Sequence, residues 1–168
     1  PPLYTLGTSA DPKDILDKTL PSFKTGRGGE VTYHGPGQRV VYAMLDLSTR
    51  EKDIRQYVWS LEEGLLLTLK EFGVEAFRRE GRVGLWVPED PGARFGRDNK
   101  IAAIGVRVSK WVTFHGVALN VNPDLAHFQG IVPCGIKGHG VTSLHDLGIK
   151  VSMQDVDEAL QRTFPQIF

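Results

Sequence analysis

The spacing of apolar residues predicts two amphipathic helices in this chain. Between residues 51 and 72, apolar side chains recur at intervals of three and four, which is typical of a helix with one buried face. These side chains are Ile54, Val58, Leu61, Leu65, Leu69 and Phe72. Gly73 follows at the position where a glycine commonly ends a helix. A second helix is predicted over residues 152–164, opened by a capping box between Ser152 and Asp155.

Runs of β-branched and aromatic residues, separated by turn-forming residues, predict several strands. The predicted strands are residues 39–47, 74–77, 83–87, 100–108 and 111–121. We expect the first to be largely buried and the last two to be joined by a turn at Ser109 and Lys110. Residues 8–24 are expected to form a surface connection with one short helical turn, and residues 124–128 a second such turn.

Glycines inside two of these strands indicate a ligand site. Gly105 and Gly116 interrupt the last two strands, and a glycine in a strand often marks the close approach of a ligand or another backbone. We therefore expect a narrow slot beside the sheet, with Trp86 in the core or in the pocket wall. Residues 26–38 hold five glycines, Arg27 and His34. This segment is either a ligand-binding loop or a glycine-rich hairpin without a ligand, and it lacks the Walker pattern of a phosphate-binding loop.

The composition is that of an ordinary globular domain. The chain has 168 residues, of which 40% are hydrophobic and 24% charged, so we expect a single domain with its own core. Twenty basic and twenty acidic residues cancel, which argues against a nucleic-acid partner. No apolar run reaches the roughly 18 residues that span a bilayer, so no membrane partner is expected. A single cysteine and the lack of a signal-peptide pattern favour the reducing cytoplasm.

The single cysteine, Cys134, lies in an unusual backbone setting. Pro133 fixes its own φ, and Gly135 can adopt a left-handed conformation, so the thiol is expected on a sharp turn. One cysteine can form neither an internal disulfide nor a four-thiolate zinc site, which leaves a reactive nucleophile or an inert apolar residue. The turn favours the nucleophile. No spacing of Cys134 with the histidines matches a zinc pattern, so no metal is expected.

Five segments, taken in order, carry a family pattern. They are the runs Arg-Gly-Gly-x-x-Thr-Tyr-His-Gly-Pro-Gly-Gln at 27–38, Lys-Ile-Ala-Ala-Ile-Gly-Val-Arg-Val at 100–108, His-Gly-Val-Ala-Leu-Asn at 115–120, Pro-Cys-Gly-Ile at 133–136 and Val-Thr-Ser-Leu at 141–144. Together they resemble the lipoyl(octanoyl) transferases, the lipoate-protein ligase B type enzymes. The resemblance implies an α/β mixed sheet of the lipoate/biotin protein ligase type (class II synthetase-like), as a single acyltransferase domain over residues 1–168. It also implies a native helix and strand ahead of residue 1.

The same resemblance implies an activity without a cofactor. Its members move an octanoyl group from octanoyl-acyl carrier protein to a lysine of lipoyl domains, those of 2-oxo acid dehydrogenases and the glycine cleavage H protein. Cys134 matches the residue that carries the acyl group as a thioester, and Lys100 the lysine that lowers its pKa. The residues that match acyl-substrate contacts are Arg27, Gly28, Gly29, Glu30, Val31, Thr32, Tyr33, His34, Ala103, Ile104, Gly105, Gly116, Val117 and Ala118. Two positions depart from the family pattern: Ala43 replaces a common proline, and Val117 a common phenylalanine.

Other functions remain open. One is an ATP-dependent lipoate or biotin ligase of the same fold. Another is a thioesterase that pairs Cys134 with one of the histidines, the candidates being His34, His115, His139 and His145. A third is a non-catalytic acyl-binding module. For the transferase, either Lys100 or His34 is the expected base of the second step.

Because acyl carrier proteins are acidic, we also expect a basic patch at the mouth of the slot. The candidate residues for this patch are Arg27, Arg39, Lys110 and Lys137.

Overall fold

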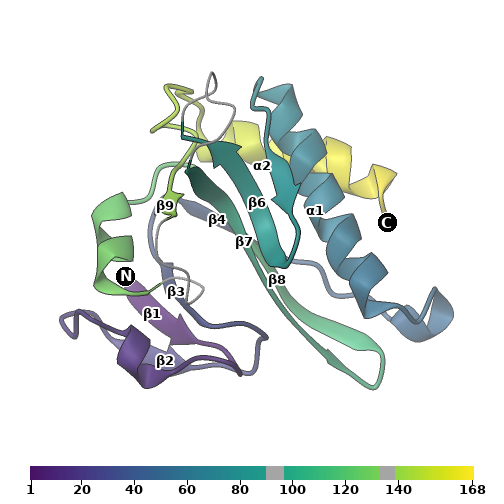
Figure 1. The fold of residues 1–168 in the computed structure, drawn as a ribbon. Helices are drawn as coiled ribbons and strands as arrows, with labels where there is room; N and C mark the ends of the chain where they lie inside the picture. Colours follow the sequence, from purple (N-terminus) through teal and green to yellow (C-terminus); the bar gives the residue numbers. More distant parts are fainter. Residues whose placement is uncertain (90–96, 133–138) are drawn as a thin grey trace.

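The computed structural model describes residues 1–89, 97–132 and 139–168. These residues form two sheets and two α-helices (Figure 1). The smaller sheet contains β1 (Leu3–Leu6), β2 (Ser22–Lys24) and β3 (Val31–His34), in the order β2-β1-β3. The larger sheet contains β4 (Gln38–Tyr42), β5 (Phe77–Arg79), β6 (Arg82–Pro88), β7 (Asp98–Ser109), β8 (Val112–Asn120) and β9 (Gly140–Val141). The helices are α1 (Ile54–Glu71) and α2 (Met153–Thr163).

The larger sheet is mixed. Its strand order is β4-β8-β7-β6-β5 with antiparallel neighbours, and β9 pairs in parallel with the start of β7. Short 3-10 helices connect the strands; they are η1 (Pro12–Asp14), η2 (Leu47–Thr49), η3 (Leu125–Gly130) and η5 (Phe164–Gln166). In the described ranges, no helix is both long and apolar enough to cross a bilayer.

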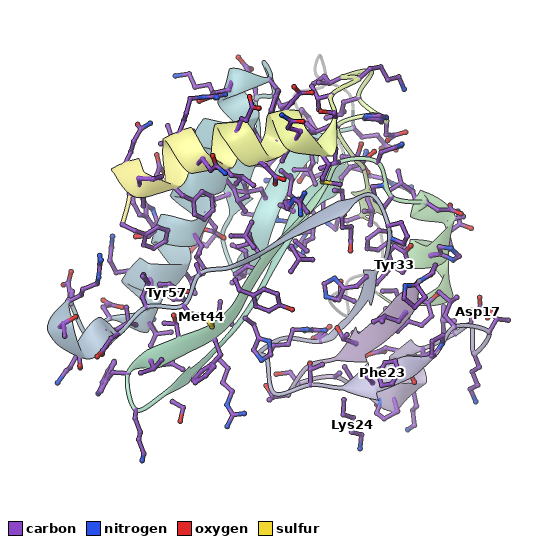
Figure 2. The ribbon with its side chains drawn as sticks, turned by 180° about the vertical axis from the view of Figure 1, so that it is seen from behind. Asp17, Phe23, Lys24, Tyr33, Met44 and Tyr57 are labelled. Carbon is purple, nitrogen blue, oxygen red and sulfur yellow. The ribbon has the colours of Figure 1, made fainter. Side chains whose placement is uncertain are left out.

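Both helices cover one face of the larger sheet, and the smaller sheet lies on its other side (Figure 1). Leu61 and Leu65 of α1 are fully buried against the large sheet, together with Leu85 and Leu119. The smaller sheet has a separate core that contains Tyr4 and Tyr33. Figure 2 shows Phe23 and Lys24 at the outer edge of this small sheet, far from Tyr57 on α1. The open face of the larger sheet is therefore left to face the smaller sheet.

Both predicted helices are confirmed, together with Gly73 and the predicted capping box, and α1 has in addition an N-cap at Asp53 that was not predicted. The Oδ1 atom of Asp53 accepts hydrogen bonds from the backbone N–H groups of Arg55 and Gln56 at 2.7 and 3.0 Å. Gly73 has φ +73°, as the end of a helix requires. The predicted capping box is present at the start of α2, where Ser152 and Asp155 each accept a hydrogen bond from the other's backbone N–H.

The predictions for β6, β7, β8 and the two helical turns η1 and η3 are confirmed with small shifts in their ends. The hairpin turn lies one residue later than expected, at Lys110 and Trp111, which both have positive φ. Residues 22–24, expected in a surface connection, instead form the short strand β2.

Two strand predictions were wrong. The strand expected at 39–47 ends at Tyr42 and is not buried, because β4 is an edge strand with only β8 beside it in the described part of the chain. Its Tyr42 is 62% exposed. The strand expected at 74–77 begins only at Phe77. Val74 instead donates its backbone N–H to the carbonyl of Leu69 at 3.0 Å, which completes the end of α1.

Candidate functional site

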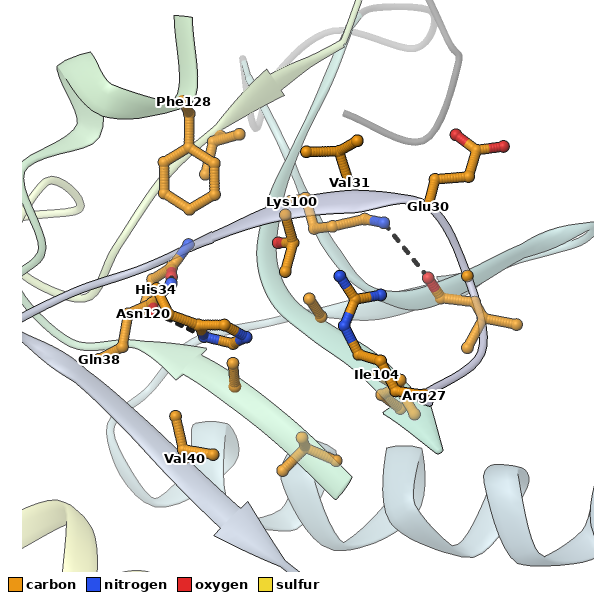
Figure 3. Close-up of a pocket in the computed structure, with 18 of the residues that line it drawn as sticks. Arg27, Glu30, Val31, His34, Gln38, Val40, Lys100, Ile104, Asn120 and Phe128 are labelled. Carbon is orange, nitrogen blue, oxygen red and sulfur yellow. Dashed lines mark hydrogen bonds between the residues drawn. The ribbon is translucent and has the colours of Figure 1, made fainter. Parts of the chain in front are cut away.

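A cavity of about 330 Å³ lies between the open face of the larger sheet and the smaller sheet (Figure 3). Its volume is at the lower end of the roughly 300–1,000 Å³ typical of ligand pockets. The wall on one side comes from the glycine-rich segment before β3, and the wall on the other from β4, β7 and β8. Both predicted ligand segments therefore meet in one place.

The floor of the cavity is formed by small residues that lie opposite one another on β7 and β8. Ala103 of β7 lies opposite Ala118 of β8, and Gly105 lies opposite Gly116. On the other side of β8, Val40 and Tyr42 of β4 continue the two rows. All of these residues line the cavity. Both glycines thus line the predicted cavity, but the Arg27 side chain packs over Gly105 and the backbone of Val41 lies against Gly116.

Lys100 faces the cavity because β7 contains a β-bulge. Leu85 of β6 pairs with Ala102, but the next residue, Trp86, pairs with Lys100, so β7 carries one extra residue there. As a result Ile101 and Ala102 are both fully buried in the core, and Lys100 lies on the opposite face. In a regular strand Lys100 and Ala102 would share one face, because side chains alternate with period two.

The ammonium of Lys100 lies in a defined position. Its Nζ donates a hydrogen bond to the carbonyl of Val83 at 3.3 Å and lies 4.7 Å from the centre of the Trp86 ring (Figure 3). Trp86 is 2% exposed and lines the cavity, which confirms its assignment to core and pocket wall. The cavity therefore has a positive charge beside an apolar slot.

His34, at the end of β3, is neutral at physiological pH. Burial of the imidazole lowers the pKa of His34, a hydrogen bond to Gln38 raises it in part, and the charge of Arg27 lowers it again. The Nδ1 atom of His34 lies 3.2 Å from Oε1 of Gln38. Gln38 also donates to Oδ1 of Asn120 at 3.0 Å. Gln38 and Asn120 were not predicted as site residues, although both belong to sequence motifs described above.

Most of the predicted site residues surround the cavity. The ones that line it are Arg27, Gly29, Glu30, Val31, Thr32, His34, Lys100, Ala103, Ile104, Gly105, Gly116, Val117 and Ala118. Among described residues, Gly28 and Tyr33 do not line it, and Tyr33 is packed into the core of the smaller sheet. Cys134 and Lys137 lie outside the described residues.

The prediction of a basic patch at the mouth of the cavity is wrong for two of its candidate residues, Arg27 and Arg39. Arg27 is 8% exposed and donates hydrogen bonds to Oγ1 and the carbonyl oxygen of Thr5 at 2.8 and 2.7 Å. Arg39 points away from the cavity and forms an ion pair with Asp157 of α2 at 2.6 Å. Lys110 is exposed in the β7–β8 turn, five residues beyond Gly105, or about 17 Å along the strand.

The remaining histidines are distributed unevenly around the cavity. His115 and His139 line it, whereas Nε2 of His145 bonds the carbonyl of Val151 at 2.8 Å outside the cavity. His145 is therefore a satisfied structural histidine and is not placed to act on a ligand there. Within the described ranges, no group of three or more His, Cys, Asp and Glu side chains is placed to hold a metal ion.

Comparison with known proteins identifies related sequences and folds. A family model described as "Lipoyl protein ligase A/B catalytic domain" matches residues 1–165. A protein named octanoyltransferase from Paramagnetospirillum magneticum is 63% identical over 169 residues, which cover 100% of this chain and 78% of the relative. The octanoyltransferase of Rhodospirillum rubrum is 59% identical over 169 residues, with coverage of 100% and 76%.

Two groups of solved structures share the fold. A lipoate protein ligase from Thermoplasma acidophilum superposes with a TM-score of 0.73 at 18% identity, covering 99% of this chain and 67% of that one. The biotin protein ligase of Aquifex aeolicus superposes with a TM-score of 0.56 at 17% identity, covering 77% and 52%. At these identities the likeness concerns the fold alone, and it confirms the predicted lipoate/biotin ligase-like architecture.

Proposed function

Because this chain belongs to the lipoyl protein ligase A/B catalytic domain family, and within it to the octanoyltransferases, we propose that its cavity binds the octanoyl chain while Cys134 carries the acyl group. The observation that carries this proposal is that Lys100 and the small-residue slot share one cavity. The donor is octanoyl-acyl carrier protein. The acceptors are lipoyl domains of 2-oxo acid dehydrogenases and the glycine cleavage H protein. Residues 1–168 act as one acyltransferase domain.

The slot suits a straight apolar chain. Ala103 and Ala118 leave a floor without bulky side chains, while the Arg27 side chain packs over Gly105 and the β4 backbone lies against Gly116. Burying about seven methylenes at ~0.8 kcal/mol each contributes ~5–6 kcal/mol before the entropic cost of binding. Arg27 and Gly29 form the opposite wall and supply polar contacts for the carbonyl end.

In the first half of the reaction, the thiolate of Cys134 attacks the carbonyl carbon of the donor thioester. The carbon–sulfur bond to the donor breaks, and the donor thiol leaves with a proton. One thioester replaces another, so the step is nearly isoenergetic and needs no ATP. An unperturbed cysteine has a pKa of about 8.5, and the Lys100 ammonium increases the thiolate fraction at neutral pH.

In the second half, the ε-amine of the acceptor lysine attacks the Cys134 thioester and forms an amide. Because Cys134 must stay a free thiol between turnovers, the reaction belongs in a reducing compartment, which we propose is the cytoplasm.

Intact-mass spectrometry tests the first half directly. The protein is mixed with octanoyl-acyl carrier protein in the absence of ATP, and Cys134→Ser serves as the control. We expect wild type to gain one octanoyl group that hydroxylamine removes, and Cys134→Ser to gain none. No adduct on folded wild type, or the same adduct on Cys134→Ser, would refute the acyl-enzyme.

A further inference from the structure

A chain of hydrogen bonds runs from Thr142 through Asn120 and Gln38 to His34. The donor and acceptor of each bond follow from the group at the Thr142 end. The chain begins at the backbone carbonyl of Thr142, which can only accept, so the group that Asn120 presents to it at 3.0 Å is Nδ2. Oδ1 of Asn120 then faces Gln38 and accepts from its Nε2 at 3.0 Å. The same Nε2 donates to the carbonyl of Tyr33 at 3.3 Å. The amide of Gln38 therefore has only one orientation.

This orientation decides which nitrogen of His34 carries the proton. Oε1 of Gln38 faces Nδ1 of His34 at 3.2 Å and also accepts from the backbone N–H of Gly35 at 3.3 Å. Because an amide oxygen only accepts, Nδ1 must be the donor. The neutral imidazole then has its lone pair on Nε2.

The lone pair of His34 faces the cavity. The imidazole ring of His34 lines the cavity. Its Nδ1 edge faces Gln38, and the opposite edge of the ring faces the middle of the cavity (Figure 3). In the part of the chain that the structure describes, Nε2 has no hydrogen-bond partner. Burial keeps the pKa of His34 below its ordinary value of about 6.5, so the ring is neutral at pH 7.

The reaction with the acceptor lysine needs a neutral base such as this imidazole. With a pKa of about 10.4, only roughly one lysine in a few thousand is a neutral amine at pH 7. Lys100 is less well placed for this purpose, because its Nζ donates to the carbonyl of Val83 and lies against the Trp86 ring.

We infer that His34 is the general base of the second half-reaction, and that Gln38 and Asn120 are positioning residues that keep its lone pair on Nε2. This inference rests on the proposed function and goes beyond it. It assigns the two half-reactions to different groups, Lys100 to loading of Cys134 and His34 to its unloading.

The transfer of the acyl group from Cys134 to the acceptor lysine moves two protons. Nε2 of His34 takes one proton from the acceptor ammonium, and the neutral nitrogen attacks the thioester carbonyl carbon. The carbon–nitrogen bond forms and the carbon–sulfur bond breaks, so the electron pair of that bond leaves with the sulfur of Cys134. The second proton of the former ammonium goes to this sulfur. The imidazolium of His34 releases its proton to solvent.

A single-turnover experiment separates the two halves. Wild type and His34→Gln are first loaded with octanoyl-acyl carrier protein, and loading is measured by intact mass. A lipoyl domain is then added, and octanoyl-lipoyl domain is measured against time. We expect His34→Gln to load fully but to transfer at least about 100-fold more slowly, as is typical of the loss of a general base.

The controls make failure distinguishable. His127→Gln changes a histidine outside the cavity and should transfer within twofold of wild type. If wild type does not load, the proposed function fails. If His34→Gln loads and transfers at the wild-type rate, only the present inference fails, and the same holds if His34→Gln is folded but cannot load.

A pH profile tests the positioning role of Gln38. The other charged and titratable groups that line the cavity among the described residues are Glu30, Arg27, Tyr42, Arg82, Lys100, His115 and His139. Dividing the wild-type rate by that of His34→Gln at each pH cancels the titration of the acceptor and of these shared groups. The ratio should fall below neutral pH. In Gln38→Glu a carboxylate faces Nδ1 and favours the imidazolium, so the fall should move to higher pH. If the pH at which the rate ratio falls is the same in Gln38→Glu as in wild type, Gln38 does not position His34.

Discussion

Ala103 and Ala118 face each other across β7 and β8, and both line the cavity from its floor. Nothing larger than a methyl group separates an acyl chain from the sheet at this level. If the cavity binds the acyl chain as proposed, the size of these two side chains limits how deep that chain reaches.

Filling this floor should shorten the preferred acyl chain. Ala103→Leu adds three carbon atoms and displaces about three methylenes of ligand, which corresponds to ~2.4 kcal/mol, or about 50-fold weaker loading with octanoyl donors. Loading from a butyryl donor should be largely retained. Rates of acyl-enzyme formation with both donors check this, with Ala126→Leu, an exposed alanine on η3, as the matched control. Equal losses for both donors would contradict the assignment of the floor.

Removing the charge of Lys100 should make Cys134 less reactive at neutral pH. Lys100→Ala should move the midpoint of iodoacetamide alkylation of Cys134 to higher pH, because the thiolate loses a neighbouring cation. Lys100→Arg should retain part of the effect. Lys110→Ala, in the exposed hairpin turn, serves as the control and should leave the midpoint unchanged. If Lys100→Ala and Lys110→Ala behave alike, the lysine does not act on the thiol.

His34 should make the folded state less stable in acid. Its pKa is lowered on folding, so the unfolded chain binds a proton more readily as the pH falls through about 6.5. The stability contribution is present above this pH and is lost as the pH falls toward the folded pKa. Urea unfolding at pH 7.5 and pH 5.5 should therefore show a larger loss for wild type than for His34→Gln. An identical loss in both proteins would mean that burial does not act on this histidine.

The N-cap of α1 should contribute measurably to stability. Asp53→Ala removes the carboxylate that accepts from Arg55 and Gln56 and should lower the free energy of unfolding by about 1 kcal/mol. Glu51→Ala removes an exposed carboxylate two residues earlier and should change it by less than about 0.5 kcal/mol. Chemical denaturation of the three proteins measures the difference, and a similar effect of both substitutions would refute a specific cap.

The elements that local sequence encodes were predictable. The period of apolar residues and the cap residues Gly73 and Ser152 are local signals, and α1 and α2 begin and end close to where these signals predict. Gly105 and Gly116 likewise indicated the place of the cavity, because a glycine in a strand marks the close approach of other groups, here the Arg27 side chain and the backbone of Val41.

Features that depend on long-range pairing were not predictable in this way. The β-bulge at Ile101 is visible only once the register between β6 and β7 is known, since the residues there look like a regular strand. The burial of Arg27 depends on Thr5, which lies 22 positions earlier in the chain. β4 was predicted to be buried because its sequence is apolar, but its place at the edge of the sheet leaves that apolar surface facing the cavity and solvent.

The hydrogen bonds around His34 also join the two sheets. His34 ends β3 in the smaller sheet, whereas Gln38 and Asn120 belong to the larger one. His34 and Gln38 are four residues apart, on the two sides of the turn at residues 35–37 that leads from one sheet into the other. The turn that connects the two sheets therefore also sets which ring nitrogen of His34 carries the proton.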